Sequence, residues 1–132
     1  MFERVAALAH AAPRHINSQE IARAAQIINK AGNVYIIGVR NAHAFALYMN
    51  YLGRMVFNNF HLMPPSASVT AEDLARLSRD DLLIAFSTSP YANETVRLVQ
   101  AAFKLGIPTI AVTDAARSPI AQSASVSICV PV

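Results

Sequence analysis

Three hydroxyl side chains, Ser87-Thr88-Ser89, end an apolar stretch and precede Pro90 and a helical pattern that starts at Ala92. Hydroxyls near the amino end of a helix can donate hydrogen bonds to an anion, and the free N–H groups of that helix end add partial positive charge. The alternative is structural, with Ser89 as the N-cap and Pro90 at the first helical position. The run therefore predicts either an anion site or an ordinary helix cap.

A second candidate loop, Gly38 to Ala42, follows the apolar run VYIIG. Arg40 in this loop carries a guanidinium that can pair bidentately with a phosphate or a carboxylate. Asn41 stands beside it as a further candidate for ligand contact. A solvated or interface arginine is the alternative, and Gly38 allows either a close approach of the backbone to a ligand or only a tight turn.

Residues that could support catalysis or metal binding are few. Glu94 is the only carboxylate near the hydroxyl run, and a glutamate in the first turn of a helix is more often explained by the helix dipole than by base catalysis. None of the histidines stands in a metal-binding spacing, and only His43 falls near the two loops. We therefore predict no catalytic residue, no metal and no cofactor.

Short apolar runs alternate with helical patterns along the chain, which is typical of parallel strands joined by helices. The expected strands are 34–38, 60–63, 82–86, 109–112 and 126–130. We predict an α/β fold, a three-layer α/β/α sandwich with a five-stranded, doubly wound parallel sheet in the order 2-1-3-4-5. Ligands of such sheets bind where the order reverses, and the loops 38–42 and 87–92 meet at that point.

The helical segments carry start and stop signals of their own. Asn17 with Glu20 predicts a capping box, and Gly32 predicts a C′ stop. In the helix 92–105, Val96, Val99, Ala102 and Phe103 are expected to face inward. The helix 41–57 is apolar nearly all round, which places it in a core or at a subunit contact. Further helices are expected at 2–12, from Thr70, and from Ser118 with Pro119 at the first helical position.

Composition narrows the class of protein. The chain has 132 residues, 54% hydrophobic and 14% charged, which fits one domain with part of its surface covered by association. Its 11 basic and 8 acidic residues are scattered, which favours a small anionic ligand over nucleic acid. The single cysteine, Cys129, excludes a disulfide framework and favours a reducing cytoplasm. No apolar run is long enough for a membrane span, and the opening residues predict no secretory signal.

Four motifs together resemble the sugar isomerase (SIS) domain family. Gly38-Val39-Arg40-Asn41-Ala42 corresponds to a family loop G-x-G-x-S, and Ser87 to Thr95 corresponds to S-x-S-G-x-T-x-E-T. Val112-Thr113-Asp114 is similar to an ITD strand end, and Ser118-Pro119-Ile120-Ala121 to an SPLA helix start. Within the family, the sequence looks like the C-terminal domain of RpiR-type bacterial transcriptional regulators.

The resemblance implies an SIS domain over residues 17–132, preceded by an N-terminal helix or linker at 1–16 and belonging to, or excised from, a longer regulator. Such a domain is non-catalytic, senses a phosphorylated sugar or a related anionic carbohydrate derivative, and pairs as a homodimer. It reaches DNA only through a separate helix-turn-helix domain. The alternative is a free-standing phosphosugar isomerase, which would need a base. The implied ligand contacts are Gly38, Arg40, Asn41, Ser87, Thr88, Ser89 and Tyr91, with Tyr91 covering the pocket.

The sequence departs from the family pattern at four positions in these loops. Arg40 replaces the second glycine of the first loop, and Ala42 replaces its serine. Pro90 and Ala92 replace the glycine and the threonine of the second loop, which removes one N–H donor and one hydroxyl. We therefore expect a ligand that differs from the usual one, either a carboxylate or a differently placed phosphate.

Overall fold

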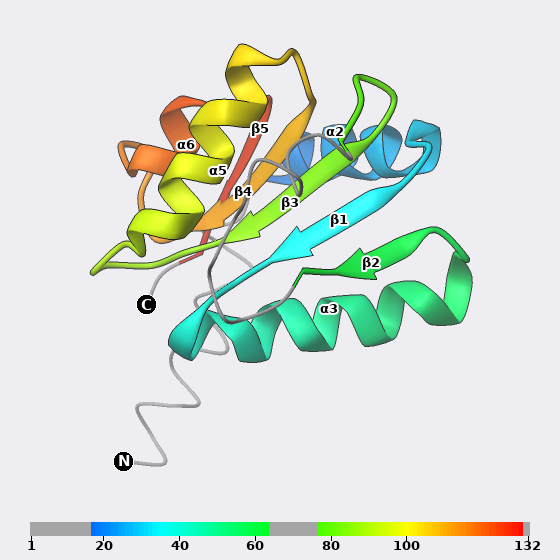
Figure 1. Ribbon diagram of the computed structural model, residues 1–132, viewed down its shortest axis with the longest axis horizontal. Helices are drawn as coiled ribbons and strands as arrows, with labels where there is room; N and C mark the ends of the chain where they lie inside the picture. Colours follow the sequence, from blue (N-terminus) through cyan, green and yellow to red (C-terminus); the bar gives the residue numbers. More distant parts are fainter. Residues whose placement is uncertain (1–16, 64–76, 131–132) are drawn as a thin grey trace.

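The computed structural model describes residues 17–63 and 77–130, which contain five strands and the helices that flank them (Figure 1). The helices expected at 2–12 and from Thr70 lie outside the described residues. The elements are α2 (Ser18–Lys30), β1 (Val34–Ile37), the 3-10 turn η1 (Arg40–Ala42), α3 (His43–Val56), β2 (Phe60–Leu62), β3 (Leu82–Phe86), α5 (Asn93–Lys104), β4 (Thr109–Thr113), α6 (Pro119–Gln122) and β5 (Val126–Cys129).

The strands form one parallel sheet in the order β2-β1-β3-β4-β5, which confirms the predicted topology. Ile36 pairs with Ile84 and Ile84 pairs with Ile110, so the three central strands place isoleucines side by side. These strands are almost continuously apolar because both of their faces are covered. Their carboxyl ends point to the left in Figure 1, toward the loops that carry the candidate site.

Helices cover both faces of the sheet, as the three-layer prediction requires. Ala24 of α2 and Ala46 of α3 pack on one face together with Val34, Ile36, Leu82 and Ile84. On the other face, α5 and α6 pack through Leu98, Val99, Ala102 and Ile120 against Ile37, Leu83, Ala85 and Ala111. Burial of these side chains supplies the main driving force for folding, at roughly 25 cal/mol per Å² of apolar surface.

Glycine at position 53 is required by the packing of α3 on β2. A Cβ atom at Gly53 would overlap the ring of Phe60, which is buried and stacked on Phe57 with ring centroids 5.4 Å apart. The helix axis therefore lies closer to the edge strand than any residue with a side chain would allow. The sequence pattern of α3 contained no sign of this contact.

Several details of the helices differ from the sequence predictions. The oxygen of Asn17 does cap α2, but Glu20 does not complete the capping box, because its carboxylate accepts hydrogen bonds from Arg23 and from the Ser127 N–H instead. Gly32 is not a left-handed C′ residue, since its φ is not positive and α2 ends at Lys30 with Ala31 as an extended C-cap.

The inward face of α5 was also predicted with one error. Phe103 is 65% exposed, whereas Leu98 is buried in the core beside Val99 and Ala102. The helix ends at Lys104, and Gly106 follows its C-cap Leu105, where a φ of 74° and a hydrogen bond from the Gly106 N–H to Phe103 O form a glycine stop.

Within residues 17–63 and 77–130, no helix is both long and apolar enough to cross a bilayer.

Candidate functional site

The loops that follow β1, β3 and β4 lie next to one another at the carboxyl edge of the sheet, because these strands are neighbours and run parallel. They carry Gly38 to Ala42, Ser87 to Ala92, and Asp114. Hydrogen bonds join the second and third of these loops, and an ion pair joins the first loop to the start of α5. The two loops that the sequence predicted to meet therefore do meet, and a third loop joins them.

The hydroxyl run does not cap α5. The helix begins at Asn93, its N-cap is Ala92, and this N-cap makes no side-chain hydrogen bond. The interpretation of Ser89 as the cap and Pro90 as the first helical residue is therefore wrong. Ser87 instead extends the sheet, since its N–H donates to Val112 O at 3.1 Å and the residue is buried.

Asp114, at the carboxyl end of β4, binds the second half of the loop 87–92, which we call the hydroxyl loop. Its carboxylate accepts a hydrogen bond from the Ser89 N–H at 3.0 Å and another from the Tyr91 hydroxyl at 2.6 Å. The Thr113 hydroxyl lies 3.3 Å from the same carboxylate. Ser89 and Tyr91, two residues that the sequence assigned to a ligand, thus donate hydrogen bonds to an internal anion through the Ser89 N–H and the Tyr91 hydroxyl.

These hydrogen bonds stabilise the negatively charged form of Asp114. The Tyr91 hydroxyl bond is the largest cause that lowers the pKa of Asp114 below its usual value. The same bond raises the pKa of Tyr91, because the phenol donates to a carboxylate and would lose that bond as a phenolate. Asp114 is therefore a carboxylate, and Tyr91 a neutral phenol, at neutral pH.

Arg40 reaches from the β1 loop to the start of α5. Its two terminal nitrogens lie 3.2 and 3.3 Å from the two carboxylate oxygens of Glu94, which is the bidentate geometry expected of arginine. The pKa of Glu94 is lowered first by its own backbone N–H and then by Arg40. The guanidinium was predicted to face a ligand, and in this structure its partner is a carboxylate of the chain.

The remaining residues of the first loop have mainly local contacts. A Cβ at Gly38 would lie 2.6 Å from the carbonyl oxygen of Ala42, so the packing of η1 alone requires glycine there. His43 Nδ1 lies 3.1 Å from Gly38 O, which makes this ring nitrogen the protonated donor. Asn41 is exposed within η1, and Thr88 in the other loop is half-buried.

Thr95 is a polar residue of this region that the sequence reasoning did not select. It lies in the first turn of α5 and is fully buried, and its hydroxyl oxygen has no hydrogen-bond partner in the part of the chain that the structure describes. Thr95 is the last residue of the S-x-S-G-x-T-x-E-T pattern, and this pattern was the sequence signal that could have identified it. Asp114 could have been identified in the same way, as the last residue of the motif Val112-Thr113-Asp114.

Comparison with known families identifies the fold. The family model of the SIS domain matches residues 27–132. The chain belongs to the SIS domain family. Among solved structures, the domain is similar to the sugar isomerase domain of an RpiR transcription factor from Sphaerobacter thermophilus, with a TM-score of 0.93 and 24% identity over 98% of this chain and 73% of that chain.

Two further proteins resemble this SIS domain. The NanR protein of Vibrio vulnificus, solved in complex with ManNAc-6P, matches with a TM-score of 0.84 and 22% identity over 97% of this chain and 48% of that chain. The bifunctional protein glk of Paraburkholderia xenovorans is 24% identical over 120 residues, which cover 86% of this chain. The chain spans only 18% of the length of that relative. At these identities the likeness to the solved structures shows a shared fold.

Arg40 has a backbone conformation that ordinarily favours glycine. Its φ is 54°, in the left-handed region, and it occupies the position of the second glycine of G-x-G-x-S. A residue with a side chain costs about 1 kcal/mol or more in this region. The loop of this SIS domain therefore has a glycine-like shape at residue 40 and carries a guanidinium there.

This conformation yields a stability prediction. Arg40→Gly and Arg40→Ala both lose the ion pair with Glu94, but only alanine keeps the left-handed strain. We expect Arg40→Gly to exceed Arg40→Ala in free energy of unfolding by about 1 kcal/mol, as measured by urea denaturation. Equal stabilities, or a more stable alanine variant, would show that residue 40 does not hold a positive φ in solution.

Within the described ranges 17–63 and 77–130, no group of three or more His, Cys, Asp or Glu side chains is arranged to hold a metal ion. The polar groups at the carboxyl edge include hydroxyls, one guanidinium and two carboxylates that already have hydrogen-bond partners. This set suits recognition of an anionic or hydroxyl-rich ligand through hydrogen bonds.

Proposed function

We propose that this SIS domain is the effector-sensing domain of an RpiR-type transcriptional regulator and binds a phosphorylated sugar or a related anionic carbohydrate derivative. The observation that carries the proposal is the cluster of hydroxyls and Arg40 at the carboxyl edge, where the strand order reverses and where ligands of this fold class bind. The similarity to an RpiR factor and to NanR, solved with a sugar phosphate, supports it. DNA contact would come from a separate helix-turn-helix domain.

The ligand contacts that we propose are Gly38, Arg40, Asn41, Ser87, Thr88, Ser89 and Tyr91. A ligand anion would replace the Glu94 carboxylate at Arg40, since both offer oxygens to the same guanidinium. Arg40 is well placed for this exchange because its side chain is 66% exposed, and exposed ion pairs are worth only about 0–1 kcal/mol. Ser87 and Thr88 would supply hydroxyls from the half of the loop that Asp114 does not hold.

The geometry favours sensing over isomerase chemistry. A phosphosugar isomerase needs a base that can take a proton from the sugar carbon skeleton. Glu94 is paired with Arg40 and its pKa is lowered, which makes it a weaker base. His43 points Nδ1 at the Gly38 carbonyl. An assay of aldose–ketose interconversion would overturn this part if it showed turnover that disappears in Glu94→Gln.

Binding can be tested with a thermal-shift panel of hexose 6-phosphates, N-acetylated amino-sugar 6-phosphates, pentose 5-phosphates and sugar acids. At least one class should raise the melting temperature, because a ligand that binds only the folded state stabilises it. Arg40→Gly, which keeps the loop shape, should weaken the response about tenfold or more in ligand concentration. If no compound stabilises the protein, or if this variant responds like wild type, the proposed site is wrong.

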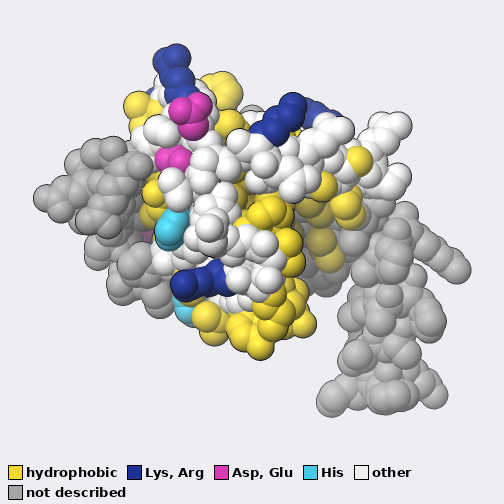
Figure 2. Space-filling view, turned by 90° about the vertical axis from the view of Figure 1, so that its right-hand side faces the viewer, with side chains coloured by type: hydrophobic (Ala, Val, Ile, Leu, Met, Phe, Trp, Pro, Cys, Tyr) yellow, Lys and Arg dark blue, Asp and Glu magenta, His cyan; other side chains and the backbone are white. Residues whose placement is uncertain are grey.

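We also infer that the domain forms a homodimer through the exposed face of α3. Seven large apolar or aromatic residues of this helix are exposed: Phe45, Leu47, Tyr48, Tyr51, Leu52, Met55 and Val56. Figure 2 shows hydrophobic side chains gathered at the lower edge of the molecule, on the side where Figure 1 places α3. The helix contains no acidic residue and one arginine. A solvent-exposed helix normally has a polar outer face, so this one is best explained by a partner.

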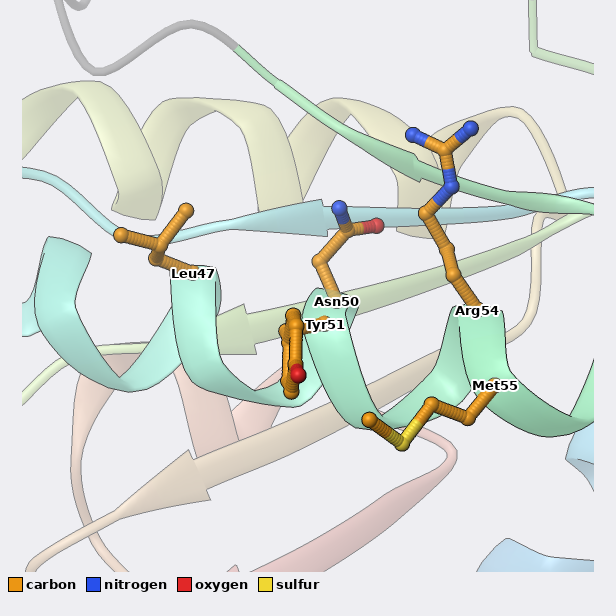
Figure 3. Close-up of a pocket in the computed structure, with 5 residues that line it drawn as sticks. All are labelled: Leu47, Asn50, Tyr51, Arg54 and Met55. Carbon is orange, nitrogen blue, oxygen red and sulfur yellow. The ribbon is translucent and has the colours of Figure 1, made fainter.

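The size of this face fits an interface between two copies. A shallow depression of about 380 Å³ runs along α3, and Leu47, Asn50, Tyr51, Arg54 and Met55 line it (Figure 3). A buried aromatic side chain removes about 150–250 Å² from water. Three aromatics with four aliphatic neighbours can therefore supply most of the roughly 800 Å² that each partner buries in a standard interface.

A further inference from the structure

Asp114 is a charged residue inside the candidate site that the ligand-binding proposal does not use. Its hydrogen-bond donors are the Ser89 N–H, the Tyr91 hydroxyl and the Thr113 hydroxyl, all of them neutral. Within the described part of the chain, no lysine or arginine lies at salt-bridge distance from it, whereas Glu94 is neutralised by Arg40. The negative charge of Asp114 is therefore fixed and uncompensated, in direct contact with the loop that is to receive an anion.

The geometry points to Asp114 as a specificity-determining residue, which holds two donors of the hydroxyl loop and makes the site select against doubly charged anions. This inference rests on the proposed function and deepens it. Since the repulsion between Asp114 and a ligand anion grows in proportion to the ligand charge, a dianionic phosphate monoester is penalised twice as much in free energy as a monoanionic sugar acid.

The two donors that Asp114 occupies also disfavour an anion on this side of the site. An anion that used the Ser89 N–H or the Tyr91 hydroxyl would first have to displace the Asp114 carboxylate, and Pro90 between them has no N–H to offer. The ligand anion is therefore directed to Arg40, Ser87 and Thr88. The Asp114 side of the site is suited to neutral sugar hydroxyls, which can donate to a carboxylate.

The test compares two probes that differ in charge, glucose 6-phosphate and glucuronate, by isothermal titration near pH 8, where the phosphate monoester is a dianion. Asp114→Asn removes the charge and keeps the shape of the side chain. We expect it to tighten glucuronate binding about threefold and glucose 6-phosphate binding about tenfold, because the gain scales with ligand charge. Asp114→Ala serves as the second variant should the asparagine variant not fold, as judged by circular dichroism.

A matched control removes the same charge elsewhere. Asp80 is exposed and lies before β3, at the opposite end of the strand from the hydroxyl loop. Asp80→Asn should change neither affinity, since a strand length separates it from the site and salt screens exposed charges beyond about 10 Å. A loosening of the loop without an electrostatic effect would change the two affinities by the same factor, and this result would overturn the inference.

The outcomes also separate this inference from the proposed function. Binding by wild type with no gain, or with an equal gain, in Asp114→Asn contradicts the role of Asp114 and leaves the proposed function standing. If glucose 6-phosphate binds to the Asp114→Asn variant and does not bind to wild type, the result supports the role of Asp114 most strongly. No binding of either probe or of the panel compounds by wild type or by the variants contradicts both.

Discussion

Phe45→Glu is expected to convert the protein from a dimer into a monomer at micromolar concentrations. Phe45 is 63% exposed on α3, among the apolar residues that we assign to the interface between two copies. A carboxylate placed in that interface would be buried without a partner, and the two-fold symmetry would bring in a second one. The dissociation constant should rise about a hundredfold or more, as for other disrupted interface anchors. Sedimentation velocity over a range of concentrations measures it.

The chain offers a closely matched control for this experiment. Phe103 is a phenylalanine of similar exposure, 65%, on α5 at the opposite face of the sheet. Phe103→Glu should leave the sedimentation coefficient at the dimer value, because Phe103 lies outside the α3 interface and the loss of one exposed apolar side chain elsewhere does not weaken the dimer. Equal effects of the two variants, or a wild-type protein that sediments as a monomer, would remove α3 as the interface.

Gly53→Ala is expected to lower the free energy of unfolding by about 2 kcal/mol, although alanine is a better helix former than glycine by about 1 kcal/mol. The added Cβ would overlap the ring of Phe60, a residue of β2 that is 3% exposed and packs against α3. Neither the ring nor the helix can move without opening the core at the edge strand. Urea denaturation monitored by circular dichroism gives the value.

A double-mutant cycle tests the cause of this loss. Phe60→Ala alone should cost about 3–5 kcal/mol through its cavity. In that background the ring is absent, so Gly53→Ala should become neutral or stabilising by about 1 kcal/mol. If Gly53→Ala destabilises both backgrounds equally, the contact with Phe60 does not explain the glycine.

The fold was predictable from the sequence because its signals are local. Runs such as LLIAF are apolar over their whole length, and a strand of this type must be covered on both faces by helices. Once five such runs alternate with helices, few topologies remain. The same reasoning failed at Phe103, because the 3.6-residue periodicity does not distinguish the edge of a helix face from its centre, and the true centre is Leu98 with Val99.

The site was predictable in position but not in its internal contacts. The switch point and the two loops followed from strand order, whereas the ion pair joins residues 54 positions apart and the Ser89–Asp114 bond joins residues 25 positions apart. No local pattern encodes which side chain satisfies which donor. The alternative of a cap at Ser89 was wrong for the same reason, since the Ser89 N–H donates to Asp114 and the helix begins only at Asn93.

The most direct measurement of the central claim is a nuclear magnetic resonance titration of the protein with the sugar phosphate or sugar acid that stabilises it best. We predict that the shifted amides cluster in two stretches, 38–42 and 87–95, together with Asp114. The competing surface is the cleft at the amino ends of the strands, where the cations Lys30 and Arg79 lie together with the carboxylates of Asp80 and Asp81. Shifts confined to that cleft, or no shifts at all, would contradict an anion site at the carboxyl edge of this SIS domain.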